Sequence, residues 1–377
     1  MARKLKSDKW LFTAMLLLVC SSVVMVYSAS AVVAQDLYND PYLFLLKQGA
    51  WALLGLGLVQ VVMRVHYRIY SQPVVIWTAL AVVALGLVIV LFGTPRNGAT
   101  RWLNVGGLGV QPSELSKIVL IVFIAALLER RMEKIDDTSH TLLPIGVVLG
   151  VMVGLILLEP DLGTSVSLVI IAAVMIFAAG INYRYVAGLA LATLPAFYIL
   201  VWRSDYRRKR VLAFLDPWAD QLGDGYQMVQ SMIAVGTGGL FGRGLMGGAQ
   251  KLHYLPEPHN DFIYAVISEE LGLIGATIVL ACFCVIAWRG LRTALRAPDR
   301  FGAFLALGLT TMVAFQAFFN VSVVLGLLPT KGIPLPFVSY GGSSLLINLV
   351  GMGILLNVSQ HASSAHVVTT TLPTADA

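Results

Sequence analysis

Long apolar runs recur along almost the whole chain, and they limit its possible folds more than any other feature. Backbone amide and carbonyl groups inside a bilayer must bond to one another, so such runs cross it as helices. The sequence is 58% hydrophobic and only 12% charged, too little charge for the surface of a soluble protein of this length. We therefore expect an all-α, polytopic membrane protein.

The apolar runs predict ten spans, and most of the loops between them are short. The first run is longer than the apolar part of a usual signal peptide, so we interpret it as a retained span. Basic residues fall mainly in the predicted inner segments, which places both termini in the cytoplasm. The net charge of +6 therefore indicates topology, and nucleic-acid binding is not expected. The predicted spans are 11–33, 44–63, 74–92, 113–128, 142–158, 165–180, 186–202, 263–288, 301–327 and 343–358.

A single transmembrane domain is predicted over residues 1–360, followed by a polar, disordered cytoplasmic tail at 361–377. One long extracytoplasmic loop, 203–262, separates spans seven and eight. It mixes apolar stretches with the glycine-rich run GTGGLFGRGLMGG at 236–248. We expect it to form short re-entrant or interfacial helices over the outer mouth of the bundle, since long loops in compact proteins tend to be functional.

Three acidic segments that contain proline fall on the predicted outer side of the membrane. They are Gln111–Glu114, which opens span four, Glu159–Asp161, which closes span five, and Glu257–Asp261, which precedes span eight. Proline is tolerated at helix starts and limits local freedom, so each segment fixes its acid at a helix end. The convergence of the three segments predicts a site. The alternative is a solvated rim of acidic helix caps.

Asp261 is the sharpest catalytic candidate. It precedes the apolar Phe262-Ile263 and follows His259, so partial desolvation should raise its proton affinity and suit it to general-base chemistry. The alternative is a helix cap. Asn caps a helix about as well as Asp, so Asp261→Asn would separate the two roles.

Two further acids have both a structural and a functional interpretation. Glu114 and Lys117 are three residues apart and share a helix face, so they form either a buried pair tying span four to a neighbour or part of a site. Asp161 precedes Leu-Gly-Thr-Ser and is either the cap of span six or a site residue.

Basic residues in the long loop are candidates for binding a diphosphate. The run Arg207-Arg208-Lys209-Arg210 lies on the outer side, against the positive-inside trend, and Arg243 lies in the glycine-rich run. Guanidinium groups bind phosphate oxygens bidentately, and glycine lets backbone amides approach an anion. The alternative for the run is a lipid-headgroup anchor. No nucleotide-binding motif is present in the sequence.

A divalent cation is a further expectation. His253, Glu257, His259 and Asp261 are candidate ligands, and carboxylate with water suits Mg²⁺ or Mn²⁺.

The three-proline segment LPTKGIPLPFVSYGGSS at 328–344 is too stiff for a linker. Non-helical backbone at membrane depth must be buried or line a wet cavity, so we expect this segment to form a wall of the outer cavity.

Several motifs spread over nearly the whole chain resemble the SEDS family, the group of FtsW, RodA and SpoVE. The KLxYLPE opening and the LPTKG loop are similar to the division-type FtsW branch more than to the elongation-type RodA branch. The matching motifs are VYSAS (26–30), RWLNVGGLGVQPSELSK (101–117), EPDLGTS (159–165), YRRKRVLAFLDP (206–217), GYQMVQSMIAVGTGGLFGRG (225–244), KLHYLPEPHNDFIYAVISEELG (251–272) and LPTKGIPLPFVSYGGSS (328–344).

The resemblance implies a ten-span peptidoglycan glycosyltransferase in the bacterial cytoplasmic membrane, acting in cell division or elongation. It would polymerise lipid II, a polyprenyl-diphosphate-linked glycan, by inverting transfer. The essential acid of the family falls on Asp261, and the charged pair of span four falls on Glu114 and Lys117. The substrate-binding candidates are Arg207, Arg208, Arg210, Arg243, Lys251, His259, Asp161, Gln111 and Ser339.

The implied partners are a class B penicillin-binding protein, which supplies the transpeptidase, and other divisome or elongasome membrane proteins. No organic cofactor is expected.

Two other functions compete with this interpretation. One is a transporter, either a lipid II flippase or an ion-coupled carrier, and the other is a non-catalytic scaffold that recruits a synthase. A carrier would place ionisable groups deep in several spans. Here the acids gather at the outer end, and spans nine and ten carry none, which favours chemistry at one surface.

Overall fold

The computed structural model describes residues 7–93, 100–105, 108–132, 138–252, 254–330 and 332–370. Within these ranges the chain is nearly all helical, with one short antiparallel hairpin in which Leu103 pairs with Val110. The helices and strands are α1 (Lys9–Tyr38), α2 (Leu43–Val62), η1 (Tyr67–Ser71), α3 (Pro73–Leu91), β1 (Leu103–Val105), β2 (Leu108–Val110), α4 (Pro112–Arg131), η3 (Thr138–Leu142), α5 (Leu143–Leu158), α6 (Leu162–Ala178), α7 (Tyr183–Trp202), α8 (Asp205–Leu215), α9 (Tyr226–Gly238), α10 (Ile263–Leu295), α11 (Arg300–Val324) and α12 (Gly342–Thr370).

Each predicted span coincides with a helix, and most of the boundaries agree within a few residues. In the described part of the chain, seven helices are long and apolar enough to cross a membrane: α1, α2, α3, α5 with its preceding turn, α10, α11 and α12. The other three predicted spans are also helical. Among these, α4 carries the charges of Glu114 and Lys117, and α6 is a shorter apolar helix of 17 residues. The chain is therefore a helical protein with several candidate membrane spans.

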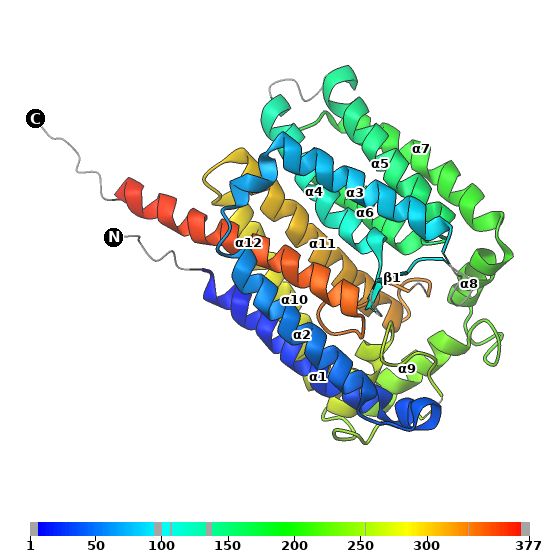
Figure 1. The fold of residues 1–377 in the computed structure, drawn as a ribbon. Helices are drawn as coiled ribbons and strands as arrows, with labels where there is room; N and C mark the ends of the chain where they lie inside the picture. The colour runs from blue at the N-terminus through cyan, green and yellow to red at the C-terminus, as the bar shows by residue number, and fades with distance from the viewer. Residues whose placement is uncertain are drawn as a thin grey trace, which may run out of the picture.

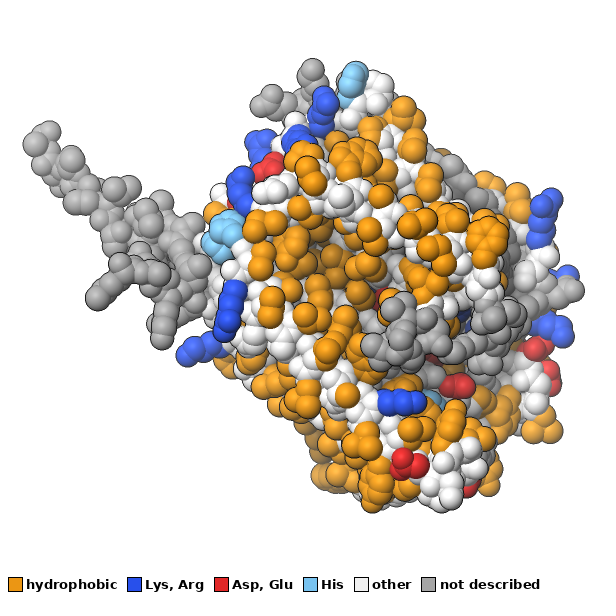
Figure 2. Space-filling model, in the orientation of Figure 1, with side chains coloured by type: hydrophobic (Ala, Val, Ile, Leu, Met, Phe, Trp, Pro, Cys, Tyr) orange, Lys and Arg blue, Asp and Glu red, His pale blue; other side chains and the backbone are white. Residues whose placement is uncertain are grey.

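The helices pack side by side in a bundle whose two ends differ (Figure 1). The start of α1 and the end of α12 lie at one end, and α8, α9 and the hairpin lie at the other. In the most apolar stretch of α12, 78% of the residues are buried, whereas in that of α2 only 22% are. The helix α12 is therefore central in the bundle, and α2 is peripheral. Hydrophobic side chains cover the middle of the face seen in Figure 2, and Lys and Arg gather toward its ends, as expected for a membrane protein.

Aspartate side chains cap three of these helices and explain where they begin. The carboxylate of Asp8 accepts from the amides of Trp10 and Leu11 at the start of α1. Asp161 caps α6 and Asp299 caps α11 in the same way. Each cap satisfies amides that have no partner inside the helix.

The helix α10 is broken at Gly272, where φ is 66° and ψ is −166°. At about 1.5 Å per residue its 33 residues extend roughly 50 Å, more than the ~30 Å hydrocarbon core needs. The part after the break, 273–295, is long enough to span a bilayer alone. The part before it, 263–271, is mostly buried within the protein and follows directly on the segment that carries Asp261.

The predicted long loop contains two helices, α8 and α9, between α7 and α10. At the other end of the chain, α12 continues to Thr370, past the predicted start of the tail at 361. The rest of that tail, 371–377, lies outside the described residues.

Candidate active site

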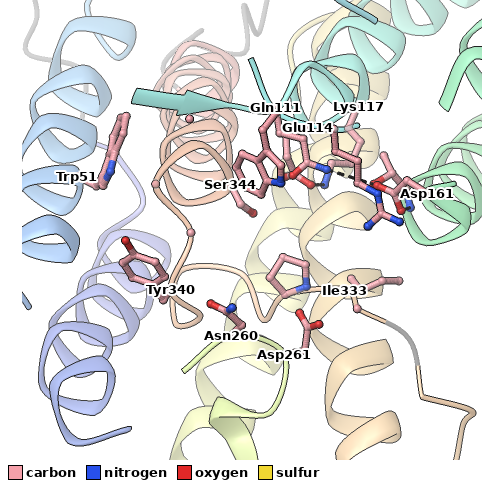
Figure 3. Close-up of a pocket in the computed structure, with 18 of the residues that line it drawn as sticks. Trp51, Gln111, Glu114, Lys117, Asp161, Asn260, Asp261, Ile333, Tyr340 and Ser344 are labelled. Atoms are coloured by element: carbon pink, nitrogen blue, oxygen red, sulfur yellow. Dashed lines mark hydrogen bonds and ion pairs between the residues drawn. The ribbon is translucent and has the colours of Figure 1, made fainter. Parts of the chain in front are cut away.

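A cavity of about 530 Å³ opens at the end of the bundle that holds the hairpin. Its walls come from six places in the chain: α2, the hairpin, the starts of α4 and α6, the segment before α10, and the segment that leads into α12 (Figure 3). The polar residues that line it are Lys47, Arg101, Gln111, Glu114, Lys117, Asp161, Thr164, Ser167, Asn260, Asp261 and Ser344. The three acidic segments predicted to converge thus each contribute at least one side chain to one cavity.

Asp261 lies in the segment before α10, and its carboxylate faces the cavity (Figure 3). The Asn320 side-chain amide donates to the Asp261 carbonyl at 2.8 Å and to the Ile333 carbonyl at 2.8 Å, which joins this segment to the proline-rich wall. Phe262 occupies the cap position of α10, and no side chain caps that helix. Asp261 therefore does not serve as its cap, and within the described chain its carboxylate accepts no hydrogen bond.

Burial, and after it the nearby Glu257 carboxylate, raise the pKa of Asp261 to about 6. Arg210 and Arg101 oppose this rise, whereas Asp161 adds to it. A carboxylate with a pKa near 6 is still ionised at neutral pH but binds protons more tightly than an exposed aspartate. Both properties suit a general base.

Glu114 and Lys117 form a buried ion pair within α4, with Lys117 Nζ 2.8 Å from Glu114 Oε1. Each residue is 3% exposed, and both line the cavity. The second carboxylate oxygen of Glu114 has no hydrogen-bond partner in the described chain. Among the described residues the pair therefore bonds within α4 and not to a neighbouring helix, and it lies in the wall of the cavity with the second Glu114 oxygen buried.

Asp161 caps α6 and also lines the cavity. Its carboxylate caps α6 through the Thr164 amide at 3.2 Å and accepts from the Thr164 hydroxyl at 2.7 Å. The Gln111 side-chain amide reaches the same carboxylate at 3.4 Å, which links the starts of α4 and α6. Both Asp161 and Gln111 line the cavity.

Glu159 belongs to the same acidic segment as Asp161 but is turned inward. It is fully buried, and neither carboxylate oxygen has a partner among the described residues. Burial, and after it the Asp161 carboxylate, raise its pKa to about 8. Arg101 donates to the main-chain carbonyls of Glu159 at 3.1 Å and Pro160 at 2.7 Å, and so holds this corner of the cavity wall.

The structure places the cationic candidates in three different settings. Lys47 and Arg101 line the cavity beside Lys117, although the sequence analysis did not select the first two. Arg210 donates to the Thr330 carbonyl at 3.1 Å and is near enough to Asp261 to lower its pKa. Arg208 is exposed on α8. Arg207 is on the same helix, and its side chain lies outside the described part of the structure.

Arg243 and Lys251 belong to a separate cluster outside the cavity. Lys251 Nζ lies 2.6 Å from Glu270 Oε1, and Arg243 Nη1 lies 3.6 Å from Glu269 Oε1. The amides of the glycine-rich region do approach anions, as their composition suggested. These anions are the protein's own carboxylates.

His259, Glu257 and Ser339 support the segment that carries Asp261. Burial lowers the pKa of His259, whose ring packs against Phe44 at a centroid distance of 4.9 Å and whose Nε2 lies 3.8 Å from Glu257 Oε2. The Ser339 hydroxyl donates to the Asn260 carbonyl at 2.7 Å. Among the described residues, no group of three His, Cys, Asp or Glu side chains is arranged to hold a metal ion. The candidate ligand His253 lies outside them.

Comparison with known proteins places this geometry in a family. The family model FTSW_RODA_SPOVE, described as a cell cycle protein, matches residues 8–364. The chain belongs to the FtsW/RodA/SpoVE family.

Relatives within the family agree over nearly their whole lengths. The probable peptidoglycan glycosyltransferase FtsW of Geobacter sulfurreducens is 46% identical over 355 residues, which are 92% of this chain and 94% of the relative. Stage V sporulation protein E of Bacillus subtilis is 42% identical over 366 residues, 96% of this chain and 99% of the relative. The FtsW-like branch predicted from the KLxYLPE and LPTKG motifs is thus supported.

Solved structures share the fold of this family member. A chain from a peptidoglycan synthase complex that coordinates polymerization and crosslinking has a TM-score of 0.76 and 31% identity, with coverage of 95% of this chain and 99% of that one. The rod shape determining protein RodA of Thermus thermophilus has a TM-score of 0.70 and 27% identity, with coverage of 94% and 97%.

Proposed function

We propose that this chain is a peptidoglycan glycosyltransferase that joins lipid II units into glycan strands at the outer face of the bacterial cytoplasmic membrane. The observation that carries the proposal is the cavity itself, where the carboxylate of Asp261 faces the same space as Lys47, Arg101 and Lys117. Glycosyl transfer from a diphosphate needs a base for the acceptor and cations for the leaving group. The names of the FtsW relatives support the same activity.

Asp261 acts as the general base in this proposal. It takes the proton from the 4-hydroxyl of the acceptor sugar as that oxygen attacks the anomeric carbon of the donor. The new glycosidic bond forms while the bond from the anomeric carbon to the diphosphate oxygen breaks on the opposite side, which inverts the configuration. The polyprenyl diphosphate leaves with the electron pair of the broken bond, and no covalent enzyme intermediate is needed.

Lys47, Arg101 and Lys117 stabilise the charge that develops on the leaving diphosphate, because they are the basic residues found among the described lining of the cavity. Arg210 lies near Asp261 and contributes to the same field. Arg207 and Arg208 on α8 assist the approach of the anionic substrate. Arg243 and Lys251 have their own carboxylate partners, so we assign them no contact with the diphosphate.

Among the described residues no group of three His, Cys, Asp or Glu side chains is arranged to hold a metal ion, but Mg²⁺ is commonly held by one or two carboxylates together with water and substrate phosphates. Asp261 and Glu257 are the carboxylates available near the site, and Glu257 is 58% exposed. A cation that accompanies the reaction would therefore be bound chiefly by the substrate diphosphate, and we assign it no step.

The proposed topology has ten spans, both termini in the cytoplasm and the segment 203–262 outside. In support, α8 and α9 lie at the end of the bundle opposite the start of α1 and the end of α12 (Figure 1). The cavity lies at that same end, where membrane-anchored lipid II can bring its sugar and diphosphate to Asp261 while its prenyl tail remains among the helices.

A class B penicillin-binding protein is the proposed partner, because a transpeptidase must crosslink the strands that this chain makes. The structural similarity to a chain from a peptidoglycan synthase complex that couples polymerization to crosslinking supports this pairing. The FtsW-like sequence favours a role in cell division, with other divisome membrane proteins as further partners.

A polymerisation assay with purified protein and labelled lipid II tests the proposal. Wild-type protein, supplied with its penicillin-binding partner, should form glycan polymer on a gel, and Asp261→Ala should form none. Equal polymer from both proteins would refute the assignment of Asp261. Translocation of lipid II across vesicles without polymer would favour a flippase, and polymer made by the partner alone would favour a scaffold.

A further inference from the structure

Two adjacent acidic residues of α10, Glu269 and Glu270, are fully buried and lie outside the cavity. They directly precede the break in α10, which is separated from them only by Leu271. Buried carboxylates in a membrane protein are costly unless they are paired, so these two require an explanation. The mechanism proposed above does not use them.

The break in α10 is occupied by the backbone of the glycine-rich region. The amides of Arg243 and Gly244 donate to the carbonyls of Glu269 and Glu270, each at 3.0 Å. Beyond the break, the amide of Leu273 donates at 2.9 Å to a carbonyl of the same region. Segment 239–244 thus supplies hydrogen bonds that α10 loses at its break.

Such close packing of backbone on backbone requires glycine. A Cβ at Gly238 would lie 1.9 Å from the Ser268 carbonyl oxygen, and one at Gly242 would lie 2.1 Å from the Glu270 carbonyl oxygen. Gly242 and Gly272 also have positive φ, which side chains rarely adopt. The glycine-rich run is therefore explained by its contact with α10, and no nucleotide needs to be invoked.

The two carboxylates hold the rest of the same region. Glu269 accepts from the amides of Ala249 at 2.9 Å and Gln250 at 3.2 Å. Glu270 accepts from the Lys251 ammonium at 2.6 Å and from the Ser28 hydroxyl of α1 at 2.7 Å. Both acids are thereby saturated by groups of this protein, and they connect α10, α1 and residues 243–251.

This cluster holds both ends of the segment that carries Asp261. Lys251 lies before that segment, and Glu270 lies after it, on the short helical stretch 263–271. The helix from Ile263 to Glu270 rises roughly 10 Å at about 1.5 Å per residue, so Glu270 lies about two helical turns beyond the segment that holds Asp261. The Tyr264 hydroxyl donates across the break to the Ala276 carbonyl at 3.1 Å, which stiffens the stretch between them.

We propose that Glu269, Glu270 and Lys251 are positioning residues that fix Asp261 against the cavity by holding both ends of its segment. This inference rests on the proposed function for its catalytic consequence, although the clamp itself is a property of the fold. Because a misplacement of about 1 Å can cost about a hundredfold in rate, a clamp this close to a catalytic carboxylate should control turnover.

The test compares Glu270→Gln with a matched control, Asp8→Asn. Asp8 also forms a partly buried ion pair, with Arg289, but this pair joins the start of α1 to the far end of α10. Four quantities are measured for each protein in complex with its partner: the melting temperature, kcat for lipid II, KM for lipid II, and amide hydrogen exchange over residues 254–262.

Glu270→Gln should lower kcat about tenfold or more, leave KM within about twofold, and speed exchange over 254–262. Asp8→Asn should lower the melting temperature without changing kcat or that exchange. If Glu270→Gln does not fold, Glu270→Gln/Lys251→Met replaces it with the same expectations, since the double variant leaves no unpaired buried charge.

Unchanged kcat and unchanged exchange in the Glu270 variant would overturn the clamp, and so would an equal loss of kcat in Asp8→Asn. A failure of the proposed function looks different. In that case Asp261→Ala and wild type behave alike in polymerisation, while faster exchange in Glu270→Gln still reports the clamp.

Discussion

Gly332 lies directly against the carboxylate of Asp261. A Cβ built on Gly332 would come within 2.7 Å of Asp261 Oδ2, too close for the two atoms to coexist. The proline-rich wall and the candidate base are therefore fitted to each other, and the absence of a side chain at position 332 creates the space that the carboxylate occupies.

Gly332→Ala should displace the Asp261 carboxylate and lower kcat about tenfold or more, because the base no longer meets the acceptor hydroxyl at the required distance. The fold should survive, since the atom that must move is the end of a side chain. Polymerisation rate and melting temperature measure the two effects. The control is Gly146→Ala in α5, where a Cβ meets nothing within 4 Å and both quantities should stay at the wild-type level.

Activity should depend on pH through Asp261, whose pKa is raised to about 6 by burial and by Glu257. The base works only when it is deprotonated, so kcat should fall tenfold per pH unit well below pH 6 and level off above it. A pH–rate profile measured at saturating lipid II checks this. A profile that stays flat down to pH 4.5 would contradict the role of Asp261.

The same shift makes an opposite prediction for stability. The folded protein binds the Asp261 proton more tightly than the unfolded chain, so this group favours folding at low pH and loses that contribution as pH rises from about 4 to about 6. At pH 7 the variant Asp261→Asn should therefore melt no lower than wild type while it loses turnover. A clear drop in its melting temperature would show that the charged carboxylate stabilises the fold.

The sequence predicted the parts of this site that depend on local pattern. Proline within three residues of an acid, at one end of a predicted span, indicated Glu114, Asp161 and Asp261, and all three line the cavity. The apolar runs likewise predicted the positions of helices, since each predicted span coincides with a helix in the structure. In these cases burial and helix geometry act over a few neighbouring residues, so the pattern is visible in the chain.

Lys47 and Arg101 could not be selected in this way. Each reaches the cavity only because α2 and the hairpin pack near the starts of α4 and α12, which no local pattern encodes. Arg243 and Lys251 are the reverse case. Basic side chains in a glycine-rich region suggested a site for a bound anion. The structure shows that their anionic partners are Glu269 and Glu270, which the break in α10 brings close. Tertiary contacts decided both outcomes.

The Glu114–Lys117 pair should respond asymmetrically to mutation. Lys117→Met leaves a buried, unpaired carboxylate and should cost about 3–5 kcal/mol of unfolding free energy, or expel Glu114 from its position. The double variant Glu114→Gln/Lys117→Met removes both charges and should be more stable than Lys117→Met alone. Thermal melts of the single and double variants measure this order, and the opposite order would contradict a buried pair.

Both of these variants should also lose polymerisation if Lys117 faces the diphosphate. The double variant is informative because it separates the two roles of the pair. Full activity in a stable Glu114→Gln/Lys117→Met protein would restrict the pair to structure and remove Lys117 from the proposed diphosphate site.

Lys47 and Lys209 offer a direct comparison of the two sets of candidate cations. Both side chains are exposed, but Lys47 lines the cavity, whereas Lys209 lies on α8 and pairs with Asp224 at 3.8 Å. Lys47→Gln should raise KM for lipid II several-fold and weaken its dependence on salt, because one charge that meets the diphosphate is lost. Lys209→Gln should change KM little, since an exposed ion pair contributes about 0–1 kcal/mol. Steady-state kinetics at two salt concentrations distinguish them, and a larger effect at Lys209 would move the diphosphate from the cavity to the basic helix.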